Sequence, residues 1–462
     1  MVSLAAFCVF SCAMNQAAIY PPVPLAPDRK LFGLGIQRTM TLLATSTPKH
    51  RNTVRVLFYG QSITEQDWSR QVADWLRSTY PNANLIIENR AIGGHSSQLL
   101  WRTAEADLYP FQPDLLIFHV YGSHLDYEKI IRNVLERTTA EVLIQTDHIT
   151  KPEELVDPAT QPEPTMANWS AWWNQFFLPD LAKRLGHVEL LNQRVLWRQY
   201  LNEKHLAPAQ LLKDGVHLND WGCYVMAKLV EQHLAYHPDE PKLWSSMVKD
   251  TKPKWDGNRL ELNFIGNRVD LVPMDSDAGK NVRVLIDGQP PSAIPNLYGV
   301  TRVSPWPGTN WPLILRITAK NPLKIEDWTV SFHNVSEDGK SFSFDVAGSK
   351  TGPDGEGRSD KPFESSSGRV AIEPEDWNLA YCKAVFKSAI PTDLKATWTV
   401  VPHFIDLPVF PAITDPTEET VVTVAQGLSN GPHRLVLEAA SDARPQLKAI
   451  RIYRPPLVPS AQ

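Results

Sequence analysis

A serine and an aspartate–histidine pair lie far apart in the chain, each just before a predicted helix. Ser62 closely follows the apolar run from Val54 to Gly60, which has the length of a buried strand. Asp214 and His217 are three residues apart, so on a turn the carboxylate can reach one imidazole nitrogen while the other faces a distant hydroxyl. A hydroxyl, a base and a group that orients the base are what nucleophilic hydrolysis requires. Taken alone, Ser62 is as typical of a helix cap.

Alternating strand and helix patterns surround these three residues. The alternation predicts a parallel sheet with helices on both of its faces. Three of the strands are apolar almost throughout, as strands buried on both sides should be. Ser62 then lies at the carboxyl edge of the sheet, where open α/β sheets bind ligands. The expected strands are 54–60, 85–92, 114–121, 141–146 and 188–191, and the expected helices are 67–79, 97–109, 127–137, 169–184, 193–204 and 221–236.

Three segments carry a resemblance to a known family. They are Gly-Gln-Ser-Ile-Thr at 60–64, Asn-Arg-Ala-Ile-Gly-Gly-His-Ser at 89–96 and Asp-Gly-Val-His at 214–217. In this order they resemble blocks I, II and V of the SGNH hydrolases, also called GDSL esterases or lipases, over roughly residues 51–237. Gln61 stands where the family ordinarily has Asp, as in some carbohydrate acetylesterases of the superfamily.

The resemblance implies a flavodoxin-like, three-layer α/β domain and a set of site residues. Ser62 would be the nucleophile, His217 the base and Asp214 the residue that orients it. The backbone N–H groups of Ser62 and Gly94 would stabilise the oxyanion. No cofactor and no metal is implied.

The third family block departs from the pattern. Where the family expects Gly-x-Asn-Asp, this chain has Gly-Ser-His-Leu at 122–125, so His124 occupies the position of the Asn. A neutral imidazole N–H could serve as the third oxyanion donor, and losing such a donor typically costs about 10² to 10³ in rate. His124 could instead contact substrate, or another group could fill the oxyanion hole. This departure leaves the substrate class open.

Further polar and aromatic side chains should meet at the same edge. His119, Tyr121 and His124 lie near the exit of the third strand, and Asp147 and His148 lie at the end of the fourth. The four histidines, counting His217, could suggest a metal site together with Asp126 and Asp147. Their spacing lacks a short-range ligand pattern, which favours a hydrogen-bonded polar rim. The aromatic stretch at 169–177 could be a platform for sugar beside the site or the contact between two domains.

Beyond residue 238 the pattern changes to about ten short strands separated by turn residues. This predicts an all-β, jelly-roll-like sandwich at 256–455, after an α/β domain at 51–238. Residues 19–50 are expected to form a linker and a short strand near Thr39 to Ala44. The segment 348–367 is expected to be a long loop; its acidic residues could ligate calcium, although an exposed turn is favoured.

Composition excludes several classes of protein. The 462 residues carry 46 Lys and Arg against 51 Asp and Glu, a formal charge of −5, with 21% charged and 43% hydrophobic residues. These values exclude wholesale disorder, a collagen-like repeat and a multi-pass membrane protein. The absence of a basic run argues against a nucleic-acid partner. The 15 Trp residues suit either stacking on sugar faces or packing in β-sandwich cores.

The first 18 residues resemble a secretory signal peptide, which predicts an exported protein, periplasmic or extracellular. Val9 to Cys12 also resembles a bacterial lipobox, in which Cys12 would carry a lipid anchor. After Ala18 no apolar stretch is long enough to span a bilayer. Cys223 and Cys382 are expected to be buried thiols. The oligomeric state is not indicated.

These features together predict a secreted serine hydrolase, a carbohydrate O-acetyl esterase acting on acetylated poly- or oligosaccharide. One alternative is an enzyme of the same fold that cleaves a glycosidic or other non-ester bond. A second is a glycan-binding protein without catalytic activity. A lipid esterase would need an apolar lid segment, which the sequence does not indicate.

Overall fold

The computed structural model describes residues 20–155, 163–240, 243–440 and 444–458. The predicted signal peptide and Cys12 lie outside these residues. None of the helices described is long and apolar enough to cross a bilayer. Cys223 and Cys382 are both buried and free, as expected. Burial raises the pKa of the Cys223 thiol to about 11 and that of Cys382 to about 12.

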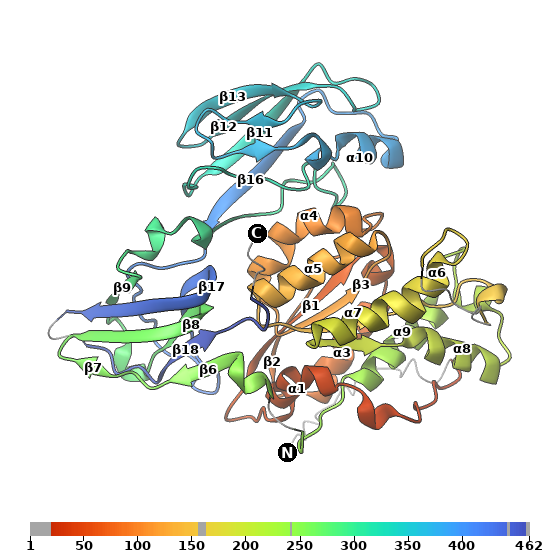
Figure 1. Cartoon of the computed structure of the whole chain (residues 1–462), viewed down its shortest axis with the longest axis horizontal. Coiled ribbons are helices and arrows are strands. Elements are labelled where there is room, and N and C mark those ends of the chain that lie inside the picture. The colour runs from red at the N-terminus through yellow and green to blue at the C-terminus, as the bar shows by residue number, and fades with distance from the viewer. Residues whose placement is uncertain (1–19, 156–162, 241–242, 441–443, 459–462) are drawn as a thin grey trace, which may run out of the picture.

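Five parallel strands form the sheet expected in the first half of the chain, in the order β2-β1-β3-β4-β5 (Figure 1). This is the doubly wound, flavodoxin-like order, so the predicted fold class is confirmed. The strands are β1 Thr53–Gly60, β2 Asn84–Asn89, β3 Leu115–His119, β4 Glu141–Gln145 and β5 Val188–Leu191. The connecting helices are α2 Ser62–Glu65, α3 Trp68–Thr79, α4 Ser97–Asp107, α5 His124–Arg137, α6 Trp169–Trp172, the π-helix η6 Trp173–Phe177, α7 Leu178–Leu185, α8 Gln193–Glu203 and α9 Asp220–His233.

Alternate residues of the central strands enter two different cores because side chains along a strand point to opposite faces. On β1, Leu57 and Tyr59 pack with α4, α5 and α7. Val56 and Phe58, on the same strand, pack with α3, α8 and α9. Helices on both faces therefore hold the carboxyl edge of the sheet in place.

The strand expected near Thr39 to Ala44 is wrong. These residues belong to the helix α1, Gln37–Ala44. Ile36, Met40 and Leu43 are buried and recur at intervals of four and three residues, which is a helical period. The β-branched threonines between them suggested a strand, but the period of the buried residues decided the structure.

The second half of the chain is mostly antiparallel β-structure, as predicted, and its strands form two main sheets. We call the first the hub sheet; it has the order β6-β18-β8-β17-β9, with β7 paired to β8. Its strands are β6 Val248–Thr251, β7 Trp255–Asp256, β8 Arg259–Val272, β9 Val282–Ile286, β17 Val422–Ala439 and β18 Ala449–Tyr453.

The other sheet lies in what we call the inserted unit, residues 298–402, because the chain enters it after β9 and leaves it before β17. Its order is β10-β16-β11-β12-β13. The segment 348–367 is therefore not one long loop, since it includes β13 and β14. The elements are β10 Tyr298–Val300, β11 Asp327–His333, β12 Ser343–Gly348, β13 Gly352–Arg358, β14 Phe363–Glu364, β15 Ala371–Ile372, α10 Leu379–Phe386 and β16 Lys395–Pro402.

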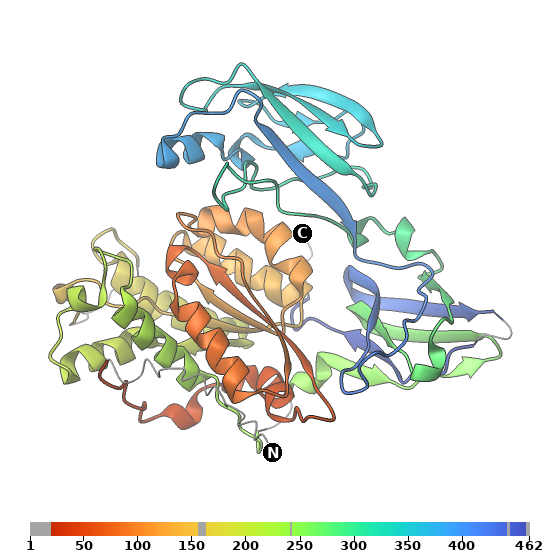
Figure 2. The same ribbon diagram turned by 180° about the vertical axis from the view of Figure 1, so that it is seen from behind.

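The two antiparallel sheets have separate cores. The hub sheet encloses its own apolar cluster, which includes Leu260 and Ile450. The inserted unit instead shares one continuous cluster with the α4 and α5 side of the α/β unit. Figures 1 and 2 show the inserted unit above α4 and the hub sheet beside the parallel sheet. Figure 2 shows this arrangement from behind.

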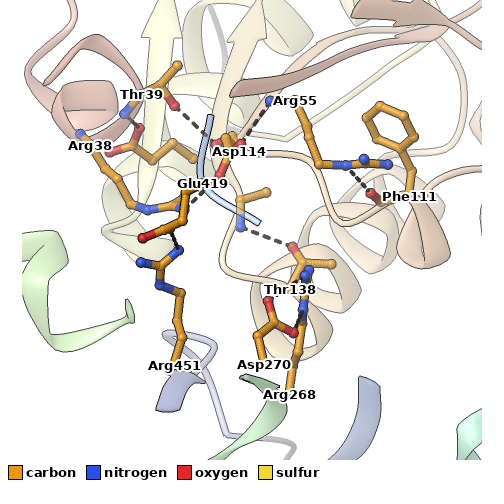
Figure 3. Close-up of polar contacts among 12 residues, drawn as sticks. Arg38, Thr39, Arg55, Phe111, Asp114, Thr138, Arg268, Asp270, Glu419 and Arg451 are labelled. Carbon is orange, nitrogen blue, oxygen red and sulfur yellow. Dashed lines mark hydrogen bonds and ion pairs between the residues drawn. The ribbon is translucent and has the colours of Figure 1, made fainter. Parts of the chain in front are cut away.

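Polar side chains line the junction between the α/β unit and the hub sheet (Figure 3). Asp114, at the start of β3, accepts from Arg38 Nη2 at 2.6 Å and from the backbone N–H of Arg55 at 2.8 Å. Arg451 on β18 pairs with Glu419 at 2.6 Å. This junction is at the amino edge of the parallel sheet, opposite the edge that carries Ser62.

Candidate active site

Ser62 begins the short helix α2 directly after β1, at the carboxyl edge of the sheet. The turn is tight at Gly60, where an added Cβ would lie 2.1 Å from the carbonyl oxygen of His119. Thr64 Oγ1 donates to the same carbonyl at 3.1 Å. Only glycine permits this close approach of β1 to β3, and the approach aims the Ser62 side chain out of the sheet.

His217 lies between Ser62 and Asp214. Its Nε2 is 2.9 Å from Ser62 Oγ, and its Nδ1 is 2.9 Å from Asp214 Oδ2. The structure therefore brings together the three side chains that the sequence analysis singled out. With Nδ1–H donating to the carboxylate, Nε2 is the nitrogen that can accept the proton of Ser62.

The turn that carries the pair is built around the Asp214 carboxylate. Asp214 Oδ1 accepts the backbone N–H of His217 at 2.7 Å and that of Val216 at 2.8 Å. These two backbone hydrogen bonds, together with the one from the His217 ring, lower the pKa of Asp214 to about 2. The carboxylate is therefore ionised at neutral pH and can stabilise an imidazolium beside it.

Two further residues hold this turn against the sheet, and the sequence analysis missed both roles. Gln66 binds Leu218 in both directions: its Oε1 accepts from the Leu218 N–H at 3.0 Å and its Nε2 donates to the Leu218 carbonyl at 2.8 Å. His148 Nε2 lies 2.8 Å from the Val216 carbonyl. No sequence signal marks a contact between residues so distant along the chain.

The loop after β2 lies beside Ser62. Asn89 anchors it, because its Nδ2 donates to the Thr64 carbonyl at 2.7 Å. An added Cβ at Gly93 would be 3.6 Å from Ser62 Cβ, and Gly94 has a φ of 72°. Within the described residues, neither the Ser62 nor the Gly94 backbone N–H donates to a protein acceptor. Both donors are free to bind an oxyanion in front of Ser62.

His124 is the first residue of α5, which Ser123 caps by accepting the Asp126 N–H at 3.3 Å. Its ring packs among aromatic side chains, with centroid distances of 5.4 Å to Trp172 and 5.8 Å to Trp169. Among the described contacts of His124 there is none with Ser62 or Gly94. The role of His124 as an oxyanion donor therefore stays a prediction.

The polar residues that follow β3 and β4 form a hydrogen-bonded rim. His119 Nε2 is 3.1 Å from Asp147 Oδ1, and Asn174 Oδ1 accepts the Asp147 backbone N–H at 2.6 Å. Burial opposes the charge of Asp147, but the hydrogen bond with His119 and the nearby positive charge of Arg194 keep its pKa below the usual range. In the part of the chain that is described, no three His, Cys, Asp or Glu side chains are grouped as a metal site would need.

The aromatic stretch at 169–177 packs largely inside the α/β unit. Trp173 and Phe177 are buried, and both rings contact Tyr127 of α5. Trp169 is half-buried and lies against His124. Core packing accounts for most of this aromatic content.

A cleft of about 790 Å³ opens beside Ser62 and His217. At its far wall Tyr20 stacks on Trp221, with ring centroids 5.6 Å apart and planes inclined by 8°. Most of its other side chains are polar. The lining residues are Tyr20, Ser62, Glu65, Gln66, Asp67, Gln210, Lys213, His217, Leu218, Asn219, Asp220, Trp221 and Cys223.

The inserted unit also reaches the site, which the sequence did not indicate. Asn310 Nδ2 donates to Glu65 Oε1 at 2.9 Å. Tyr381, on α10, donates its hydroxyl to the Gly94 carbonyl at 2.9 Å. An added Cβ at Gly94 would lie 2.5 Å from Trp311 Cζ2, so the indole covers this glycine.

Among known proteins, no family model matches the chain, and no curated protein matches it. A two-domain esterase active on acetylated mannans is similar in structure, with a TM-score of 0.35 and 12% identity over 92% of this chain and 96% of that chain. A catalytic mutant of an acetylxylan esterase from Geobacillus stearothermophilus gives a TM-score of 0.34 and 15% identity over 41% of this chain and 97% of that chain. The case for function below rests on the geometry of the site.

Proposed function

We propose that this chain is a serine hydrolase of the SGNH type that removes O-acetyl groups from carbohydrate. The observation that carries the proposal is the pair of hydrogen bonds made by His217, 2.9 Å to Ser62 Oγ and 2.9 Å to Asp214 Oδ2. An ionised carboxylate, an imidazole and a serine hydroxyl in this order can activate the hydroxyl at neutral pH.

In the proposed mechanism, His217 Nε2 takes the proton of Ser62 as Oγ attacks the ester carbonyl. The N–H groups of Ser62 and Gly94 bind the oxyanion of the tetrahedral intermediate, and Asp214 compensates the imidazolium. The imidazolium then protonates the departing sugar alkoxide, which leaves an acetyl ester on Ser62. A water molecule deprotonated by His217 releases acetate and restores the serine. No cofactor takes part.

The character of the cleft supports a hydroxyl-rich leaving group. Charged and amide side chains, among them Asp67, Gln210 and Lys213, line the space beside the triad. Tyr20 and Trp221 add stacked aromatic rings at its wall, and such rings suit the apolar faces of sugars.

The proposal extends to the organisation of the chain. We propose an exported protein with a signal peptide at 1–18, an esterase domain at 51–238 and an accessory β-region at 256–455. His124 is proposed as the third oxyanion donor, in a rotamer that turns the ring from Trp172 toward the substrate.

Ser62→Ala tests the nucleophile. We expect the variant to fold with an unchanged circular dichroism spectrum and to lose hydrolysis of p-nitrophenyl acetate and acetate release from acetylated mannan and xylan. Ser78→Ala is the matched control, because Ser78 is exposed on α3 and lies outside the lining of the cleft. Undiminished turnover by Ser62→Ala would refute the mechanism. Acetate release from aryl ester but from neither polysaccharide would refute the carbohydrate substrate.

A further inference from the structure

His95 is fully buried beside the two glycines of the loop after β2, and the mechanism above does not use it. Its Nδ1 lies 3.1 Å from the Gly93 carbonyl oxygen, and its Nε2 lies 3.4 Å from Asn378 Nδ2. Burial lowers the pKa of His95 to about 4, so the ring is neutral at pH 7. A carbonyl only accepts, so Nδ1 carries the hydrogen and Nε2 accepts from the Asn378 amide.

This hydrogen bond bears on the direction of the Gly94 N–H. Gly93 C=O and Gly94 N–H belong to one planar trans peptide unit, so the two groups point in opposite directions. A donor that holds the carbonyl on one side therefore fixes the N–H on the other side. His95 is that donor for the N–H that the mechanism assigns to the oxyanion.

The inserted unit holds both His95 and the next peptide unit. Trp311 packs edge-on against the His95 ring, with centroids 4.7 Å apart and planes at 85°. Asn378 is itself fixed, because its Nδ2 also donates to the Pro312 carbonyl at 2.9 Å. Tyr381 donates to the Gly94 carbonyl at 2.9 Å. His95, which Asn378 and Trp311 hold, therefore fixes the peptide unit before Gly94, and Tyr381 fixes the peptide unit after it.

We propose that His95 is a positioning residue of the oxyanion hole, and that the inserted unit sets its orientation through Asn378 and Trp311. The inference deepens the proposed function and rests on it for its kinetic consequence. Its structural core, that His95 and Tyr381 orient the Gly94 peptide units, can be measured whether or not the protein is an esterase.

Four variants separate positioning from packing. His95→Phe keeps a ring beside Trp311 but removes the donor, whereas His95→Asn keeps an N–H donor close to the place of Nδ1. Tyr381→Phe removes only the hydroxyl that reaches Gly94. Tyr298→Phe is the matched control, because the Tyr298 hydroxyl also donates to a backbone carbonyl of the same region, that of Ser292 at 2.9 Å, outside the site.

The direct readout is the amide signal of Gly94. Gly93–Gly94 is the one Gly-Gly pair in the sequence, so protein made with glycine labelled at ¹³C′ and ¹⁵N gives a single carbonyl–amide correlation in an HNCO spectrum. We expect this signal to shift in His95→Phe and Tyr381→Phe, to return toward its wild-type position in His95→Asn, and to stay in place in Tyr298→Phe. An unmoved signal in His95→Phe would overturn the inference.

The kinetic readout uses p-nitrophenyl acetate and a small alkylboronic acid, which forms a tetrahedral adduct with an active serine. We expect His95→Phe to lower kcat by about tenfold or more with KM within about twofold, since a misplaced group can cost about 10² in rate. Boronic acid binding should weaken by a similar factor, and His95→Asn should restore most of both.

Equal kinetic losses in His95→Asn and His95→Phe would overturn the positioning role. A wild-type protein without hydrolysis that depends on Ser62 would instead refute the proposed function, and the HNCO result would still decide the structural core of the inference.

Discussion

At the scale of single residues, the Asp214 carboxylate has two tasks in one place. It closes its own turn by accepting two backbone N–H groups, and it accepts the His217 Nδ1–H. The first task needs only an oxygen acceptor, whereas the second needs a negative charge in the proposed transition state. A substitution that keeps the oxygen and removes the charge separates the two tasks.

Asp214→Asn is that substitution. The amide oxygen can keep the two backbone hydrogen bonds, so we expect little change in the thermal unfolding midpoint. We expect kcat for p-nitrophenyl acetate to fall by about 10⁴, because the amide cannot stabilise the imidazolium and favours the wrong tautomer. A loss of less than tenfold in kcat would show that Asp214 serves the turn alone.

Two glycines with similar backbone conformations give a second test at this scale. Gly94 and Gly186 have φ values of 72° and 68°, but an added Cβ would meet Trp311 at Gly94 and nothing within 4 Å at Gly186. Both Ala variants should lose about 1 to 2 kcal/mol of unfolding free energy from backbone strain, and Gly94→Ala should lose about 1 to 3 kcal/mol more because its Cβ overlaps Trp311. Only Gly94→Ala should also lower kcat, on the order of 10². Urea unfolding and steady-state kinetics measure the two effects, and equal kcat values would contradict the assignment of Gly94.

At the scale of elements, the buried strands were predictable because an apolar run of strand length in a globular protein usually forms a buried strand. The expected strand 188–191 matches β5, and the expected helix 193–204 ends one residue later than α8. Helix α1 was missed because its threonines suggested a strand. The pattern of apolar residues does not indicate the π-helix at Trp173–Phe177.

Ser62, Asp214 and His217 could be predicted because each follows a strand or precedes a helix, and parallel strands bring such ends to one edge. Gln66, His95, Trp311 and Tyr381 could not, because their importance comes from contacts between elements distant in the sequence. The separation of the two antiparallel sheets into units with different cores could not be predicted for the same reason. Strand patterns fix the length and the buried face of a strand but not its partner.

The contact between α4 and the inserted unit gives a prediction at this scale. Asp107 on α4 is buried and pairs with Arg302 at 2.7 Å. Burial raises the pKa of Asp107 even with this partner present. We expect Arg302→Ala to cost about 3 to 5 kcal/mol of unfolding free energy, because it leaves a buried carboxyl group without its cation.

Arg70→Ala is the control for this ion pair. Arg70 pairs with Asp67 and Asp74, but its side chain is 61% exposed, so we expect a cost below about 1 kcal/mol. Urea unfolding followed by tryptophan fluorescence compares the two variants. Equal costs would contradict a tight, desolvated contact between α4 and the inserted unit.

At the scale of the whole molecule, buried histidines predict how stability depends on pH. Burial lowers the pKa of His95 and His148 to about 4 and that of His233 to about 3. The unfolded chain, with histidine pKa values near 6.5, therefore binds more protons than the folded chain between about pH 6.5 and 4. The three histidines contribute their whole stabilisation of the folded protein above about pH 6.5, and this stabilisation is lost as the pH falls through this window.

Buried and half-buried carboxyl groups with a raised pKa act in the opposite direction; they are Glu141, Asp107, Glu189 and Glu231. Burial raises the pKa of Glu141 to about 7. The contribution of the protonated Glu141 to the free energy of unfolding is therefore lost as the pH rises from about 4.5 to 7. Among the buried groups with the largest pKa shifts in this range, three are histidines and one is a glutamate, so we expect the urea midpoint to be higher at pH 7 than at pH 5. His233→Phe should reduce that difference. A midpoint independent of pH would show that the folded and unfolded chains bind the same number of protons between pH 5 and 7, which would contradict the expected excess of histidine protonation in the unfolded chain.

The inserted unit leaves and rejoins the hub at neighbouring points, since Tyr298 pairs with Pro402 in the ladder of β10 and β16. A segment whose ends adjoin in the fold, although residues 298 and 402 lie far apart in the sequence, can be exchanged by recombination at the two corresponding positions of a gene, while the strands on either side keep their spacing. Because this segment also supplies Trp311 and Tyr381, its exchange would replace the contacts that they make with Gly94 in a single event and leave Ser62 and His217 in place. The surroundings of Gly94 could thus change through exchange of one segment, without a series of single substitutions around Ser62.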